Sequence, residues 1–310
     1  MELVKLKPAI KQYIWGGTYF KNLGKGNGGE QIISECWELS DRGNDSSIIV
    51  SGPNKGQKLC DAITPKDIGP VYKKYEKLPL LIKLIDAQEN LSVQVHPCDK
   101  YAQEHEDSLG KAEMWYIIEA DKGCGLYVGL KQKSNREEIE NALQNGTILD
   151  YLNFVEVKPG EAYFIKPGTI HAIGKGVRLL EVQENSDITY RLYDYNRLDK
   201  NGNPRELHIE KGLDVIDYEK YKQDSQPDGF LVRNKFFAVE KQILMEPRDI
   251  KKKEYSFMSF TFLDGKGDVD GIEYGPYDTF FVPHGQDFHV NGTGTIILSY
   301  LIDYEGRLEH

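Results

Sequence analysis

The chain has 310 residues, of which 39% are hydrophobic, and its 49 acidic and 39 basic residues give a formal net charge of −10 at pH 7. This apolar content argues against extensive disorder, and the length is enough for about two domains. The acidic balance disfavours nucleic acid and anionic membranes as main partners, so an anionic small substrate would need a local pocket of Lys and Arg.

Targeting signals are not evident in the sequence. The N-terminal residues lack the apolar core of a signal peptide, and no window approaches about 20 uninterrupted apolar residues. The cysteines are widely scattered and form no CxxC pair, which is typical of reduced thiols in a cytoplasmic protein; they are Cys36, Cys60, Cys98 and Cys124. We therefore expect a soluble cytoplasmic protein.

The first part of the chain predicts strands and loops. Residues 1 to about 60 are irregular and strand-forming, whereas residues 61–76 are polar and broken by two prolines, so we expect loops with a short helix there. The dense apolar run at residues 78–87 does not continue as a helix and predicts a buried strand.

A second strand is expected at residues 91–96, and it carries two candidate ligands. Period-2 alternation places Gln94 and His96 on one face and apolar side chains on the other. Residues 111–120 predict a further strand, on which Lys111 and Glu113 share a face. A Gln and a His on the polar face of a half-buried strand are unusual.

Two helical patterns follow within this region. Residues 99–107 predict an exposed helix, and residues 134–145 predict an amphipathic helix. Ser134 and Glu137 have the spacing of a capping box at the start of the second helix.

The second half of the chain again favours strands. Residues 153–195 predict several strands separated by Pro-Gly and Gly-Lys-Gly turns, and residues 205–218 predict a helix. The polar segment 219–229 is the expected domain linker. Residues 230–304 predict a run of short aromatic-rich strands.

Four side chains from separate segments have the chemistry of metal ligands. Taken alone, Gln94 and His96 would more often be structural, but Glu113 follows on another strand and His171 lies just past the tight bend at residues 167–168. Zn²⁺ is bound by histidine nitrogen and carboxylate oxygen from neighbouring strands. Two neutral His, one Gln and one carboxylate would leave a divalent ion with a charge of about +1 and an open coordination position.

The same segments resemble a known family. Residues 160–171 resemble the second cupin motif, with Lys166 where that motif usually has proline, and Gln94 stands where the first cupin motif has a histidine. Over residues 5–218 the chain is similar to type I phosphomannose isomerases. The similar segments are Gln12-x-Tyr-x-Trp15-Gly-Gly17, residues 78–97, residues 111–115, residues 167–176 and residues 184–197.

The resemblance implies a fold and a reaction. The fold would be mainly β, with two cupin (jelly-roll) β-barrel domains and a small helical insertion at about residues 99–146. Residues 1–222 would form the catalytic domain, and residues 223–310 a cupin-like domain that packs on it without a metal. The reaction would be the interconversion of mannose 6-phosphate and fructose 6-phosphate through an enediolate, with one Zn²⁺ per chain.

The resemblance also implies roles for individual residues. Arg191 suits a phosphate, Lys111 could bind phosphate or transfer a proton, and Asp187 could be the base or hold Arg191. Longer family members have a histidine before the lysine, whereas this chain has Gly110, so no mechanism through that imidazole is expected. The implied metal ligands are Gln94, His96, Glu113 and His171, and the implied catalytic residues are Arg191, Lys111 and Asp187. Lys111 and Arg191 are also the expected substrate contacts. Trp15 is a further candidate contact that would stack on the sugar, although a buried Trp more often belongs to the core.

Two other functions fit the same ligand set. A non-haem Fe(II) dioxygenase would use His96, Glu113 and His171 as a two-His, one-carboxylate triad, but a phosphate-binding Lys and Arg argue against it. A metal-stabilised sugar-binding or regulatory protein would bind without catalysis, and no basic face or DNA-binding helix pair supports it. We expect a sugar phosphate as partner, no nucleic acid, no membrane, and a monomer or weak homo-oligomer.

Overall fold

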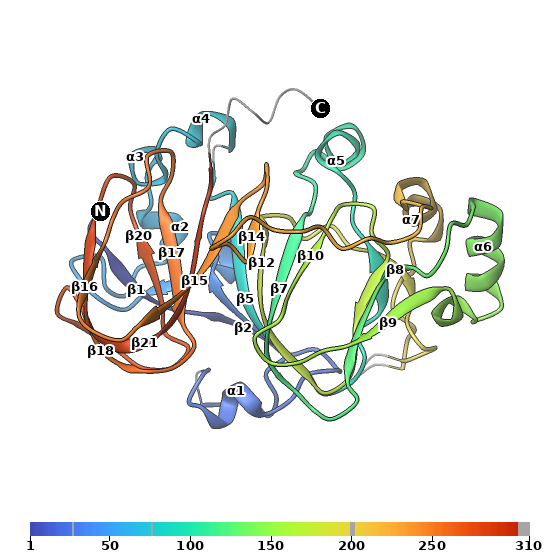
Figure 1. Ribbon diagram of the computed structural model, residues 1–310, viewed down its shortest axis with the longest axis horizontal. Helices are drawn as coiled ribbons and strands as arrows, with labels where there is room; N and C mark the ends of the chain where they lie inside the picture. Colours follow the sequence, from blue (N-terminus) through green and yellow to red (C-terminus); the bar gives the residue numbers. More distant parts are fainter. Residues whose placement is uncertain (27, 76, 199–201, 303–310) are drawn as a thin grey trace. The chain divides into compact units, whose positions relative to one another are not determined.

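The protein is mainly β, as predicted, in a computed structural model that describes residues 1–26, 28–75, 77–198 and 202–302. Strands outnumber helices throughout the described residues (Figure 1). The chain divides into two compact units. The first comprises residues 1–10, 37–83 and 225–310, and the second comprises residues 11–36 and 84–224.

Each unit contains more than one segment of the sequence, so no single boundary separates them. One boundary, at residues 224 and 225, lies inside the predicted linker 219–229. The N-terminal strand β1 (Val4–Lys7), however, pairs antiparallel with β20 (Thr279–Val282), so it belongs to the sheet formed by the C-terminal segment. The division into a catalytic domain ending at residue 222 and a separate C-terminal domain stays a prediction.

The first unit is built on one large antiparallel sheet with the strand order β14-β15-β21-β17-β20-β1-β4, to which β16, β18 and β19 are added through β21 and β18. The segment predicted as loops with a short helix contains three single-turn helices, α2 (Leu59–Ala62), α3 (Pro65–Ile68) and α4 (Tyr72–Tyr75). The remaining strands are β4 (Ile48–Ile49), β14 (Val232–Arg233), β15 (Ala238–Leu244), β16 (Arg248–Ile250), β17 (Met258–Phe262), β18 (Lys266–Val269), β19 (Ile272–Tyr274) and β21 (Phe288–Tyr300).

Stacked aromatic rings fill the core of the first unit. Phe260 stacks on Phe280 with ring centroids 5.1 Å apart and on Phe288 at 4.6 Å, and Phe262 stacks on Tyr274. Phe260 and Phe280 are direct cross-strand partners, which places both rings on the same face. The aromatic strands predicted for this region are confirmed, although β21 is much longer than the short strands expected.

The second unit contains two sheets. One has the strand order β13-β6-β11-β8-β9. The other has the order β10-β7-β12-β5-β3-β2, of which β5, β3 and β2 are divided between the units. Their bounds are β2 (Ala9–Lys11), β3 (Glu35–Leu39), β5 (Leu80–Ala87), β6 (Val93–Val95), β7 (Glu113–Ala120), β8 (Gly125–Leu130), β9 (Leu152–Glu156), β10 (Ala162–Ile165), β11 (His171–Ile173), β12 (Val177–Glu184) and β13 (Tyr190–Tyr193).

The two sheets of the second unit share one hydrophobic core. Trp115 and Ile117 of β7 pack in the same buried cluster as Leu126 and Val128 of β8. The opposite face of the five-stranded sheet is covered by the helices α6 (Arg136–Gln144) and α7 (Ile209–Val215), which lie together beside β8 and β9 in Figure 1. One face of this sheet therefore meets the other sheet, and the other face meets helices.

The predicted helices of the second unit need two corrections. Helix α5 (Asp99–Glu106) has its expected place, but α6 begins after Asn135, whose side chain accepts a hydrogen bond from the Glu138 backbone N–H. The predicted Ser134 cap is wrong, because Ser134 instead donates to the Glu138 carboxylate. The helix predicted at residues 205–218 is also shorter, at residues 209–215. The second unit also contains α1 (Tyr19–Asn22).

No helix in the described part of the chain has the length and hydropathy of a membrane-spanning segment.

The N-cap of α6 can be tested by its effect on the stability of the protein. Asn135→Ala should lower the free energy of unfolding by about 1 kcal/mol, because an unpaired N-terminal N–H replaces a capped one. Asn141→Ala is the matched control, since it changes an exposed position inside the same helix and should leave stability unchanged or slightly raised. Chemical denaturation of both variants is the measurement, and equal midpoints would contradict the cap assignment.

Candidate metal centre

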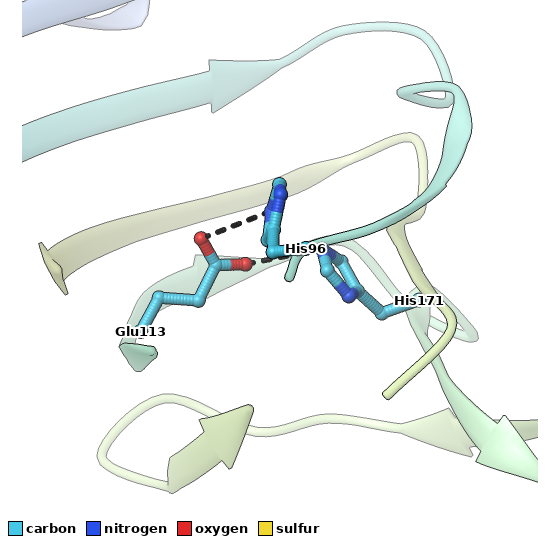
Figure 2. Close-up of side chains that lie close together, drawn as sticks. All are labelled: His96, Glu113 and His171. Carbon is cyan, nitrogen blue, oxygen red and sulfur yellow. Dashed lines mark ion pairs between the residues drawn. The ribbon is translucent and has the colours of Figure 1, made fainter. Parts of the chain in front are cut away.

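Three buried side chains converge in the second unit. Nε2 of His171 lies 3.1 Å from Oε1 of Glu113, and Nε2 of His96 lies 3.5 Å from Oε2 of the same carboxylate. Figure 2 shows the two carboxylate oxygens directed at the two rings. One ligand atom from each residue lies within 4.8 Å of the others. The side chain of His96 is 1% exposed, and those of Glu113 and His171 are 0% exposed.

The ends of strands bring these residues together. His96 directly follows β6, Glu113 begins β7, and His171 begins β11 after the Pro-Gly turn. Gly168 in that turn has a φ of 87°, which favours glycine, and its N–H donates to the His96 carbonyl at 2.8 Å. The turn that precedes one histidine therefore also holds the backbone of the other.

Backbone carbonyls set the tautomer of both rings. Nδ1 of His96 lies 2.8 Å from the Ile188 carbonyl oxygen, and Nδ1 of His171 lies 2.8 Å from the Thr169 carbonyl oxygen. A carbonyl oxygen only accepts, so each Nδ1 carries the hydrogen and donates it. Nε2 of the neutral His96 ring is thus left with a lone pair, and Nε2 of His171 is the ring atom that faces Glu113, which is the arrangement required of metal-binding histidines.

The charges favour a cation at this point. Burial by itself would raise the pKa of Glu113, but Lys111 and the neighbouring histidines outweigh it and hold that pKa well below its ordinary value. Burial, followed by the charge of Lys111, lowers the pKa of His96 to about 3, so this ring is neutral at pH 7. An ionised carboxylate and imidazole lone pairs that face one another in a dry site fit a divalent cation such as Zn²⁺.

Gln94 lies beside the histidines in the sheet. It is the direct cross-strand partner of His171 on β11 and of Arg191 on β13, so the three side chains project from the same face. Nε2 of Gln94 lies 3.3 Å from Nε2 of His171. A half-turn of the amide would present Oε1 at this place, which is the atom that a cation requires.

Lys111 is buried against the same cluster. Its Nζ atom lies 3.1 Å from Oε2 of Glu113 and 3.2 Å from Nε2 of His96, and the residue is only 5% exposed. The prediction that Lys111 and Glu113 share a face is confirmed. A fixed positive charge thus lies at the edge of the ligand set.

Arg191 belongs to a cluster of arginines that the sequence did not reveal. Arg197 and Arg205 both donate to the Asp194 carboxylate, whereas Arg191 donates from Nη1 to the Glu206 carbonyl. The buried Nε of Arg191 has no hydrogen-bond partner among the described residues. Burial, followed by the charge of Arg205, lowers the pKa of Arg191. One Asp carboxylate thus serves two arginines and leaves local positive charge.

Asp187 and Trp15 are the remaining candidate residues. Asp187 is exposed in the loop before β13 and does not lie on the strand that carries Arg191. Trp15 is 4% exposed and packs in the core cluster that contains Trp115. Their roles toward a substrate stay predictions.

Two further polar residues of the site were missed. Glu181 accepts a hydrogen bond from the Trp115 indole at 2.8 Å, and Gln183 is the cross-strand partner of Glu113. Both are buried on β12. Their spacing of two, with the apolar Leu180 and Val182 at the alternate positions, was the available signal, because it places both on one face.

The chain is similar to proteins of one family. The family model for the catalytic domain of type I phosphomannose isomerase matches residues 3–124. Mannose-6-phosphate isomerase ManA of Bacillus subtilis (strain 168) is 34% identical, over 95% of this chain and 98% of that protein. A mannose-6-phosphate isomerase of Streptococcus mutans is 38% identical, over 68% of this chain and 66% of that protein.

Solved structures agree with this similarity. The crystal structure of the Bacillus subtilis mannose 6-phosphate isomerase has 31% identity and a TM-score of 0.85, and it covers 97% of this chain and 100% of that chain. A zinc-bound mannose 6-phosphate isomerase shares the fold at 18% identity and a TM-score of 0.76, over 97% of this chain and 100% of that chain.

The low pKa of His96 predicts how stability depends on pH. In the metal-free protein, folded His96 stays neutral down to about pH 3, whereas in the unfolded chain it binds a proton near pH 6.5. The unfolded chain holds more protons between these values, so the free energy of unfolding falls as the pH is lowered, by up to about 1.4 kcal/mol per pH unit.

Denaturation of the metal-free protein from pH 7 to pH 4 measures this dependence. His96→Gln should reduce the slope, and His105→Gln, at an exposed position on α5, should retain the wild-type slope. Identical slopes for the wild type and His96→Gln would show that His96 is not held neutral.

Proposed function

We infer the function of this chain from one premise: it belongs to the type I phosphomannose isomerase family. The chain is an aldose-ketose isomerase that interconverts mannose 6-phosphate and fructose 6-phosphate and depends on Zn²⁺. The observation that carries this conclusion is the convergence of His96, Glu113 and His171, with both Nε2 atoms facing one buried carboxylate.

The fold supports a finer proposal about architecture. In the second unit, two antiparallel sheets enclose a common core, and the candidate ligands lie at the ends of their strands. We propose that each unit is a cupin barrel and that helices α5 and α6 belong to an insertion at about residues 99–146. In the predicted division the catalytic domain is residues 1–222, and the second cupin domain, residues 223–310, holds no metal. Residues 1–10 and 37–83 would complete the second barrel, because they belong to the same compact unit as the C-terminal strands.

The reaction moves a carbonyl from C1 to C2, so a proton leaves a carbon beside a carbonyl and charge develops on oxygen. We propose that Zn²⁺ is held by Gln94, His96, Glu113 and His171, and when bound it supplies positive charge that stabilises the enediolate. The carbonyl acceptors at Ile188 and Thr169 keep both rings in the ligand tautomer throughout.

Arg191 is the proposed phosphate contact. Its side chain projects from the same face as Gln94 and His171, and its buried Nε is available to an anion. The neighbouring Arg205 and Arg197 share the single Asp194 carboxylate, so a phosphate would find excess positive charge there. The planar guanidinium can hold two phosphate oxygens at once.

Lys111 and Asp187 are the proposed residues for proton transfer. The Lys111 ammonium lies beside Glu113 in a buried position, where it can donate to a sugar oxygen or hold developing negative charge. Asp187 is next to Ile188, whose carbonyl orients His96, so its carboxylate lies on the same short turn as part of the metal centre. Of these two groups, the Asp187 carboxylate is the one that can accept a proton while Lys111 is an ammonium.

We propose that the protein works in the cytoplasm without nucleic acid or membrane partners, as a monomer or weak homo-oligomer. The cysteines are widely scattered along the sequence, which is typical of reduced thiols, and the net charge of −10 disfavours polyanionic partners.

The proposed function predicts a metal-dependent exchange of hydrogen. Treatment with a chelator should abolish isomerisation of mannose 6-phosphate, and added Zn²⁺ should restore it together with exchange of the C2 hydrogen into solvent. Elemental analysis should find one Zn²⁺ per chain in the wild type and in His105→Ala, and much less in His171→Ala. Full activity of the metal-free protein would rule out this function for the site, and oxygen consumption would favour a dioxygenase instead.

The phosphate role of Arg191 predicts a selective change in KM. Arg191→Lys should raise KM for mannose 6-phosphate at least about 10-fold, since a lysine cannot hold two phosphate oxygens in the same plane. Arg136→Lys is the matched control, because Arg136 forms ion pairs between exposed side chains of α6 and α7. Steady-state kinetics decide the point, and an unchanged KM in Arg191→Lys would contradict the assignment.

A further inference from the structure

We propose that Gln183 is a positioning residue, which orients the metal ligand His96 by holding the turn between β12 and β13. This inference rests on the proposed metal centre. It assigns a role to a buried amide that contacts neither ligand ring by a hydrogen bond in the structure, and its effect passes through backbone carbonyls.

The strand register places Gln183 next to the site. It is the direct cross-strand partner of Glu113 in the antiparallel pair of β12 and β7, and both residues are 0% exposed. Direct partners project from the same face with their Cβ atoms about 5 Å apart. The Gln183 side chain therefore projects next to that of Glu113 and is shielded from water.

The contacts of Gln183 determine how its amide is turned. Its Nε2 atom donates to the Glu184 carbonyl at 2.8 Å and to the Ser186 carbonyl at 2.6 Å. Both amide hydrogens are thus used on acceptors that cannot donate, so a flipped amide would face two carbonyl oxygens with its own oxygen. The side chain ties the end of β12 to the turn.

The tied turn leads directly to the metal ligands. The Ser186 hydroxyl accepts from the Ile188 N–H at 3.4 Å, and the Ile188 carbonyl accepts from Nδ1 of His96 at 2.8 Å. On the other side, Glu184 exchanges two hydrogen bonds with Ala112, the residue before Glu113. The segment that Gln183 holds therefore contacts the backbone beside one ligand and the ring of another.

Packing alone does not explain an amide at this position. Oε1 of Gln183 is buried and has no hydrogen-bond partner among the described residues. A buried acceptor left unpaired is destabilising, whereas a methionine of similar length would have no such atom. The two donated hydrogen bonds are what the glutamine adds, and they act on the turn.

The test compares Gln183→Met with Ser259→Ala. Ser259 donates to the buried Phe280 carbonyl in the first unit, so its replacement also removes a buried side-chain hydrogen bond, far in the sequence from the ligands. Zn²⁺ affinity is measured by competition with a chelator, and the absorption spectrum of the Co²⁺-substituted protein reports ligand geometry. Gln183→Met should bind Zn²⁺ about 10-fold more weakly and shift the spectrum, and Ser259→Ala should do neither.

A milder variant covers the case in which Gln183→Met does not fold. Ser186→Ala removes only the hydroxyl that accepts from Ile188 and should weaken Zn²⁺ binding in the same direction by a smaller factor. Wild-type affinity and an unshifted Co²⁺ spectrum in either folded variant would overturn the role of Gln183 while leaving the isomerase function in place. A wild-type protein that binds no Zn²⁺ would instead overturn the metal centre itself.

Discussion

A buried carboxylate that faces the Nε2 atoms of two imidazole rings is the constraint on which the site depends. Glu113 is fully buried and stays ionised because Lys111 and the histidines oppose the effect of burial on its pKa. A negative charge in a dry interior is stable only beside positive charge, and Lys111 supplies one at the edge of the ligand set. The second unit thus uses its core to hold a carboxylate and two histidines that fit a divalent cation, as a metal-dependent enzyme requires.

The groups around the ligands are mostly backbone carbonyls presented by turns. Ile188 and Thr169 orient the two rings, and the hydrogen bond from Gly168 to the His96 carbonyl ties the two histidine segments together. Because carbonyls only accept, they specify the tautomer without adding titratable charge. The charged side chains, Lys111 beside the ligands and Arg191 in its arginine cluster, give a local positive field on a protein whose net charge is −10.

Much of the local structure could be predicted from the sequence. The apolar run at residues 78–87 is the buried strand β5, and the polar alternation around Gln94 and His96 marks a strand that leads into the site. Strand periodicity and turn residues act over a few positions, so they can be recognised without knowing the rest of the fold. The convergence of His96, Glu113 and His171 was predicted from ligand chemistry and family resemblance.

What depends on distant pairing could not be predicted in the same way. Three features depend on strand register across long sequence separations. They are the pairing of β1 with β20, the position of Gln94 between His171 and Arg191, and the hydrogen bonds from Gln183 to the β12–β13 turn. The sequence by itself determined which residue types could bind a cation and where strands would form, because backbone periodicity is local. Only the tertiary structure decided the tautomers and the partners of each charge, because these depend on which carbonyls and carboxylates the folded sheets bring within hydrogen-bond distance.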